Sequence, residues 1–164
     1  MFFLFSQNIS QRYNFVDFII IQMDDNSRNL DQQLREAYLA TTYEVKQLGL
    51  FIKIGEPNWH LEEFLVDNNV FTWAFISAYN PYSKALSLVE NEKRHAEFLV
   101  EVKKMDLVFA EGYGVPANSD WTAEKSLLIL DISKEEAITV GKRWKQNALV
   151  WGRLGGVAEL VVIV

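Results

Sequence analysis

Two glutamates are the residues best suited to acid–base chemistry in this sequence. Glu111 and Glu124 flank the segment 112–121, so both side chains can approach the rim of one loop. Paired carboxylates act as general acid and base, or hold a hard divalent cation. Isolated glutamates at strand ends are more often solvated or paired with arginine, and Arg94 and Arg143 are available for this. The catalytic hypothesis is that Glu111 or Glu124 is the general base of a small, metal-independent enzyme.

Asparagines at the ends of apolar segments could orient a polar substrate for these carboxylates. Asn80 follows the apolar run 71–78 and precedes Pro81, and Asn147 leads into the apolar run 148–152. Polar groups at strand ends form binding sites in layered α/β proteins. Pro81 favours extended geometry at Asn80. In the alternative, Asn80 bonds its own backbone in a turn, and Asn147 satisfies the end of the preceding helix.

A helix and a tryptophan complete the predicted site. Asn91 and Arg94 lie three residues apart on one face of a predicted helix, so they could act together, with Arg94 holding an anion. A solvated helix face is the ordinary alternative. Trp121, with Trp144 and Trp151, could line a stacking surface for a planar ligand, although tryptophans are more often core anchors. The predicted ligand-binding residues are Asn80, Asn91, Arg94, Trp121 and Asn147.

Several common kinds of site are missing from the sequence, and we therefore predict no metal and no cofactor. The chain has no cysteine, which excludes disulfides, thiolate zinc sites and a cysteine nucleophile. His60 and His95 are the only histidines, and neither belongs to an HExxH-like motif. Gly112 and Gly114 follow a predicted strand but open no helix, so they do not match a dinucleotide-binding motif.

The charge balance argues against a nucleic-acid partner. The chain has 16 basic and 22 acidic residues and a formal net charge of −6. Non-specific nucleic-acid binding depends on Lys and Arg neutralising phosphates. Stacking of a single strand on tryptophan and tyrosine is kept as a third functional alternative. No apolar run approaches the roughly 20 residues that a membrane span needs, and the lack of cysteine fits a reducing compartment. We therefore expect a cytoplasmic protein without a membrane partner.

Hydrophobic periodicity predicts the elements that would position these residues. Helices are expected after Asn29 or Asp31, after Asn58, from Ser87 to about Lys104, and after Ser133. The last two open with capping boxes, Ser87 with Glu90 and Ser133 with Glu136. Strands are expected at 41–45, 50–54, 71–78, 107–110, 127–130, 148–151 and 159–164. The segment from Glu111 to about Trp121 is expected to be a turn-rich loop.

Two strand–helix–strand units with a hairpin at each end indicate an α+β protein, with a mixed sheet and helices packed on it. One domain is expected over residues 29–164, and residues 1–28 are expected to be an N-terminal extension. The extension is either an added strand or anchor segment, or a stretch that precedes a natural start at Met23. The second explanation is favoured because residues 24–27 look like an ordinary frayed start.

A series of short motifs runs in order through most of the chain. The motifs are Tyr38 with residues 41–43, residues 54–57, 74–81, Ser87 with Glu90, Asn91 and Arg94, residues 111–112, Trp121 with Glu124 and Ser126, and residues 146–152. Over residues 36–163 the chain resembles a bacterial family of short proteins, the domain-of-unknown-function 3293 family. The resemblance carries no established activity. It implies that Asn80, Asn91, Arg94, Glu111, Glu124 and Asn147 belong to one set.

Two functions remain open from the sequence. The first is a binding or regulatory module that holds a small polar ligand or a partner protein. The second is a small enzyme in which Glu111 or Glu124 is the base, Asn80 and Asn147 orient the substrate, and Arg94 holds an anion. Both require these groups to converge on one cavity, and neither predicts an oligomeric state.

Overall fold

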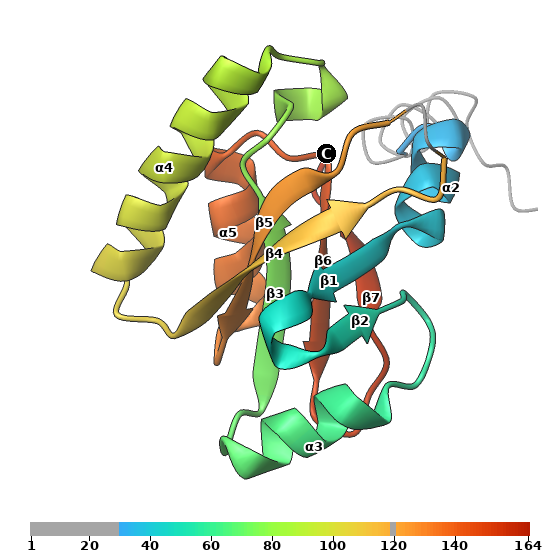
Figure 1. Cartoon of the computed structure of the whole chain (residues 1–164), viewed down its shortest axis with the longest axis vertical. Coiled ribbons are helices and arrows are strands. Elements are labelled where there is room, and N and C mark those ends of the chain that lie inside the picture. Colours follow the sequence, from blue (N-terminus) through green and yellow to red (C-terminus); the bar gives the residue numbers. More distant parts are fainter. Residues whose placement is uncertain (1–29, 119–120) are drawn as a thin grey trace, which may run out of the picture.

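The computed structural model of the protein describes residues 30–118 and 121–164. The predicted extension, residues 1–28, lies outside the described residues. Within them, seven strands form one sheet in the order β2-β1-β4-β5-β3-β6-β7, and all neighbouring strands are antiparallel (Figure 1). The strands are β1 (Thr42–Val45), β2 (Leu50–Ile52), β3 (Thr72–Ser77), β4 (Phe109–Val115), β5 (Glu124–Leu130), β6 (Ala148–Arg153) and β7 (Glu159–Val162).

The centre of the sheet consists of two interleaved strand–helix–strand units. The first is β3, α4 (Leu88–Lys104) and β4, and the second is β5, α5 (Lys134–Arg143) and β6. Strands β3 and β4 run in the same direction, but β5 lies between them. Likewise β3 lies between β5 and β6. This is the ferredoxin-like arrangement of split β–α–β units.

The predicted α+β class is confirmed, with both units and the terminal hairpins β1–β2 and β6–β7 in place. A mixed sheet was expected, because a strand–helix–strand unit returns the chain in a parallel direction. In the structure, each strand–helix–strand connection passes over one intervening strand. The two parallel strands of a unit are therefore not neighbours in the sheet. The described residues contain one isolated parallel bridge, between Ile54 and Ala158.

That bridge shows that the sheet is curled. Ile54 follows the edge strand β2, and Ala158 precedes the opposite edge strand β7. The amide of Gly55 also donates a hydrogen bond to the Ala158 carbonyl at 2.9 Å. The two edges therefore approach each other at one end, and the sheet forms a half-barrel with an inner and an outer face.

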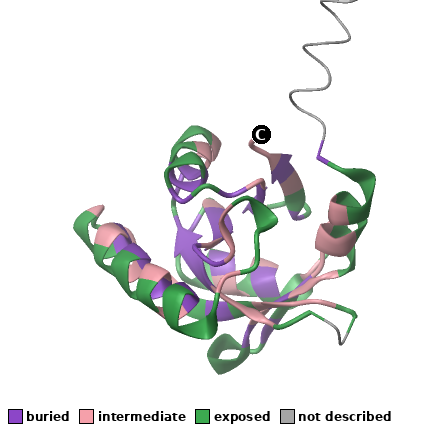
Figure 2. Ribbon diagram, turned by 90° about the horizontal axis from the view of Figure 1, so that it is seen from above, coloured by how far each residue is buried: buried purple, intermediate pink, exposed green. Residues whose placement is uncertain are grey.

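Helices α4 and α5 cover the outer face. Both open with the predicted capping boxes, at Ser87 with Glu90 and at Ser133 with Glu136. Their apolar sides pack on alternate residues of the sheet, and the resulting core includes Ala74, Ile76, Phe98, Val102, Leu127, Ile129, Val140 and Trp151. Buried positions gather at the centre of the molecule, and exposed positions lie on the outward sides of the helices (Figure 2). None of the helices in the described parts of the chain is long and apolar enough to cross a membrane.

The inner face packs against a third helix at one end only. In α3 (Trp59–Asp67), Leu61 and Leu65 are buried against inner-face residues of the sheet. Asn58 is the N-cap of this helix, as predicted, and its Oδ1 accepts from the Leu61 amide at 3.0 Å. A fourth helix, α2 (Gln32–Ala40), lies near the other end (Figure 1). That end of the inner face is left open for a pocket.

The segment after Glu111 is not the loop that the sequence predicted. Strand β4 continues to Val115, and β5 already begins at Glu124. The glycines were interpreted as turn residues, but Gly112 permits a close approach inside the sheet. A Cβ atom there would overlap the carbonyl oxygen of Glu44 and lie 2.8 Å from Cζ of Phe75. A strand can contain glycine where backbone and side chains from neighbouring elements come this close.

We expect Gly112→Ala to destabilise the fold by about 1–3 kcal/mol, since the new methyl group has no room. Urea denaturation would measure the change in the free energy of unfolding. Gly114→Ala is the matched control, because its Cβ would lie 3.7 Å from the nearest atom, Cγ2 of Thr41. Equal stability of the two variants would show that the close approach at Gly112 does not constrain the sheet.

Candidate functional site

A pocket of about 520 Å³ opens between α2 and the inner face of the sheet. Tyr43, Phe75 and Val150 belong both to its wall and to the inner-face core. The loop after β3 contributes Asn80 to the rest of the wall, the segment before β5 contributes Trp121, helix α4 contributes Asn91 and strand β5 contributes Glu124. This volume lies within the range of roughly 300–1,000 Å³ that small-molecule sites occupy.

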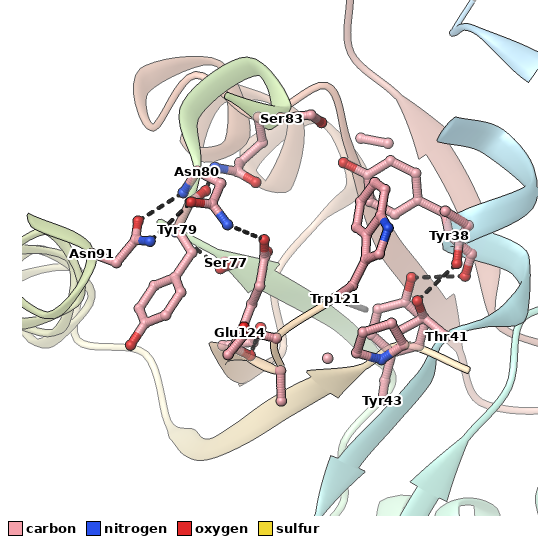
Figure 3. Close-up of a pocket in the computed structure, with 18 of the residues that line it drawn as sticks. Tyr38, Thr41, Tyr43, Ser77, Tyr79, Asn80, Ser83, Asn91, Trp121 and Glu124 are labelled. Carbon is pink, nitrogen blue, oxygen red and sulfur yellow. Dashed lines mark hydrogen bonds between the residues drawn. The ribbon is translucent and has the colours of Figure 1, made fainter. Parts of the chain in front are cut away.

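One wall of the pocket carries a cluster of three side chains that the sequence predicted as site residues. Asn80 donates from Nδ2 to Oε1 of Glu124 at 2.6 Å. Its Oδ1 accepts from Nδ2 of Asn91 at 2.9 Å, and its backbone amide donates to Oδ1 of Asn91 at 2.9 Å (Figure 3). The cluster joins the end of β3, helix α4 and the start of β5. These three predicted residues therefore converge on one cavity.

The loop that begins at Asn80 has a strained backbone. Asn80, Tyr82 and Ser83 have φ values of 44°, 53° and 57°, in the left-handed region. Extended geometry was expected at Asn80 because Pro81 follows, and this expectation is wrong. The Asn80 side chain compensates, because its Oδ1 also accepts from the Leu86 amide at 3.0 Å, and asparagine tolerates this region better than most residues.

Glu124 is a partly buried acid at the centre of this wall. Burial raises the pKa of its carboxyl above the ordinary value of about 4.5, and the hydrogen bond from Asn80 opposes the shift. Burial disfavours the charged form of an acid, and a hydrogen bond to the carboxylate favours it. The net direction shows that desolvation is the larger effect. Such a shifted acid inside a cleft is typical of functional sites.

Aromatic side chains form the opposite wall of the pocket. Tyr38 comes from α2, Tyr43 from β1, and Trp121 precedes β5; all three lie across the pocket from Glu124 (Figure 3). The Tyr43 hydroxyl donates to the Tyr38 carbonyl at 3.1 Å. The Tyr43 ring meets Phe75 edge-on, with ring centroids 5.4 Å apart. Burial raises the pKa of Tyr38 to about 12 and that of Tyr43 further, so both phenols are protonated at neutral pH.

Glu111 lies on the other side of the sheet, and its predicted pairing with Glu124 is corrected. In the β4–β5 register Gly114 is opposite Glu124, and Gly112 is opposite Ser126. Because successive residues of a strand face opposite sides, Glu111 points to the outer face. There its Oε2 lies 3.4 Å from Nε2 of His95 on α4. The two glutamates therefore cannot act on the same substrate.

Arg94 also does not face the pocket. Its Nε donates to the Ala78 carbonyl at 2.6 Å, and its Nη2 donates to the Trp144 carbonyl at 2.8 Å. The guanidinium lies 5.3 Å from the ring centroid of Trp144. Arg94 thus ties α4 to the ends of β3 and α5, and its donors are directed at backbone carbonyls instead of at an anion.

Asn147 supports the rim of the pocket from behind. Its Nδ2 donates to Oγ of Ser83, in the strained loop, at 2.9 Å. Of the three tryptophans considered for stacking, Trp121 lines the pocket and is half exposed. Trp144 and Trp151 are buried in the core on the outer face. A stacking surface built from all three is therefore not formed.

The site predicted from the sequence did not include several residues that line the pocket. They include Tyr38, Tyr43, Ser77, Ser126 and Gln146. Tyr38 and Tyr43 resemble ordinary apolar positions of a helix and a strand. Ser77 and Ser126 were detectable in principle, because each is a polar residue at the end of an otherwise apolar strand, and the two are paired in the β3–β5 register. That pairing requires the strand order, which periodicity does not provide.

We expect Glu124→Gln to increase the free energy of unfolding at pH 7. The native state binds the Glu124 proton more tightly than the unfolded state does, so this residue's contribution to stability falls as pH rises from about 4.5. Urea denaturation between pH 4 and 7 should show the advantage of the variant growing with pH. The control Glu90→Gln should show the opposite trend, because the hydrogen bond with Ser87 lowers the pKa of Glu90. A Glu124→Gln protein less stable than wild type at every pH would contradict the argument.

We expect Asn91→Ala to destabilise the protein by about 1–3 kcal/mol, because the partly buried Asn80 amide loses its acceptor and Oδ1 of Asn80 loses one of its two donors. The same urea denaturation measures the loss. Asn147→Ala is the control, since its hydrogen bond to Ser83 is exposed and should contribute less. Similar losses in both variants would mean that the cluster has no special role in stability.

Comparison with known proteins finds a family model that matches part of this chain. The family model described as "Protein of unknown function (DUF3293)" matches residues 76–149. This range runs from β3 into β6 and contains all seven residues that the sequence predicted for the site. No curated protein and no solved structure matches the chain. The match falls on the family that the ordered motifs indicated, and it supports that resemblance over residues 76–149.

Proposed function

We propose that the protein is a binding module for a small organic ligand, held in the pocket between α2 and the inner face of the sheet. The observation that carries this proposal is the convergence of Asn80, Asn91 and Glu124 on one wall of an aromatic-lined pocket of about 520 Å³. Ligand sites are mostly apolar cavities in which a few placed polar groups fix the orientation.

The position of the pocket within the fold supports the proposal. The interior of a curled sheet is normally filled by side chains or by a ligand. Here Leu61 and Leu65 of α3 fill one end of the inner face. The other end has Ser77, Ser126 and Glu124, which leave space and supply polar groups. A ligand would occupy this unfilled end.

The rigidity of the rim also supports binding. Left-handed residues other than glycine cost about 1–3 kcal/mol each and persist only when their surroundings hold them. Around residues 80–83 the holding groups are the Asn80 side chain, the Lys145 carbonyl, which accepts from the Tyr82 amide at 2.6 Å, and Asn147. A wall fixed in advance loses less entropy when a ligand binds.

Binding is favoured over catalysis because Glu124 is the one acidic or basic side chain, tyrosine aside, among the described residues that line the pocket. Glu111, one of the two alternative bases of the catalytic hypothesis, and Arg94, its anion-holding group, are engaged outside the pocket. Tyr38 and Tyr43 keep their protons, since burial raises their pKa values. A general acid or base is most effective when its pKa lies near the working pH, and the two buried phenols do not meet this condition. Glu124 alone is sufficient for recognition.

A ligand screen with pocket-blocking variants tests the proposal. Ala37→Trp places a large side chain on α2 at a pocket-lining position, and Leu39→Trp places the same side chain at an exposed position outside the lining. In a thermal-shift screen of a metabolite library, we expect compounds that raise the Tm of wild type and of Leu39→Trp by a few degrees. The same compounds should not stabilise Ala37→Trp. Compounds that stabilise both variants equally would show that binding occurs elsewhere.

A further inference from the structure

Building on the pocket proposed above, we propose that its ligand carries a positively charged nitrogen, an ammonium or amidinium group, on an apolar or aromatic body, and that this group pairs with Glu124. The inference concerns the chemical class of the ligand. It rests on the charges, the free hydrogen-bonding capacity and the aromatic surface of the pocket wall.

The charge of the wall is negative and is not balanced from within. Among the described residues that line the pocket, Glu124 is the only one with an ionisable acidic or basic side chain other than tyrosine. The next residue, Lys125, faces the outer side, where its Nζ binds Oε2 of Glu92 at 2.6 Å. Arg94 is occupied by two backbone carbonyls. In the described parts of the chain, no cation reaches the Glu124 carboxylate.

Glu124 also has an oxygen atom that is available to accept a hydrogen bond from a ligand. Its Oε1 accepts from Asn80, whereas its Oε2 accepts no hydrogen bond from the described residues. The neighbouring hydroxyls are already engaged. Ser77 donates to the Lys125 carbonyl at 2.8 Å and accepts from the Tyr79 amide at 3.0 Å, and Ser126 donates to the Glu124 carbonyl at 3.2 Å. A ligand that satisfies this wall must therefore bring donors.

A cationic donor gains more here than a neutral one. A carboxylate withdrawn from water is costly unless it is paired, and the burial that raises the pKa of Glu124 is the sign of this cost. An ammonium or amidinium group would compensate for it with a charge-assisted hydrogen bond, which is roughly twice as strong as a neutral one. An anionic ligand would meet a like charge with no cation to offset it.

The aromatic wall suits the same class of ligand. The faces of Trp and Tyr rings attract cations, and their apolar surface accommodates the ligand body. Trp121, Tyr38 and Tyr43 lie across the pocket from Glu124 (Figure 3). Beyond the larger effect of burial, the charge of Glu124 further raises the pKa of Tyr38 and Tyr43, so these rings lie within its field. A cation between them would interact favourably with both walls.

Matched ligand series provide the test. Phenylethyl, indolylethyl and naphthylmethyl compounds would each be used as the amine, the alcohol and the corresponding carboxylate, so that only the polar group varies. Isothermal titration at pH 7 should give binding of an amine at least about tenfold tighter than its alcohol, and no measurable binding of its carboxylate. Glu124→Gln should abolish the preference for the amine. The control Glu92→Gln, on the outer face, should retain it.

The outcomes separate this inference from the proposed pocket. If alcohols or carboxylates bind as tightly as amines, or if Glu124→Gln keeps the preference, the cationic class is wrong while the pocket remains a binding site. The cationic class is also wrong if none of the series binds and the library ligands that Ala37→Trp excludes carry no positively charged nitrogen. If no compound in the library screen distinguishes Ala37→Trp from Leu39→Trp, the pocket itself is not the site and both proposals fail.

Discussion

The side chain of Asn80 connects three parts of the chain that are distant in sequence. Its Nδ2 binds Glu124, 44 residues away, and its Oδ1 accepts from Asn91 and from the Leu86 amide. The backbone amide of the same residue donates to Asn91. These bonds hold the left-handed backbone at Asn80 and fix where the Glu124 carboxylate lies. Without these hydrogen bonds, the left-handed backbone at the rim of the pocket would be unfavourable.

The curl of the sheet gives this cluster a cavity to face. Helices α4 and α5 cover the outer face, and α3 fills one end of the inner face. Because successive side chains of a strand point to opposite faces, the polar residues of β4 and β5 are divided between the two faces of the sheet. Glu124 and Ser126 face the pocket, whereas Glu111 and Lys125 face α4, where they bind His95 and Glu92. Two adjacent residues of β5 therefore have different roles: Glu124 lines the pocket, whereas Lys125 pairs with Glu92 on α4.

Local patterns in the sequence predicted most of the fold. The two capping boxes, the N-cap at Asn58, the first hairpin and the apolar run of β3 each depend on a few adjacent residues, and all are present in the structure. Strand β4 was missed beyond Ala110, because Gly112 and Gly114 are typical of turns when no neighbour is known. Their actual role, a close approach to Glu44 and Phe75 at Gly112, involves residues from two other strands.

The sequence by itself determined the class of fold and the residue types of the candidate site, because hydrophobic periodicity, helix capping and strand-end polar residues are local properties. Only the tertiary structure decided which of those residues meet. Asn80, Asn91 and Glu124 converge because β5 lies beside β3 and α4 crosses over both. Arg94 and Glu111 are directed elsewhere by the same arrangement. Strand order and side-chain facing arise from packing across the whole sheet, and no short stretch of sequence contains them.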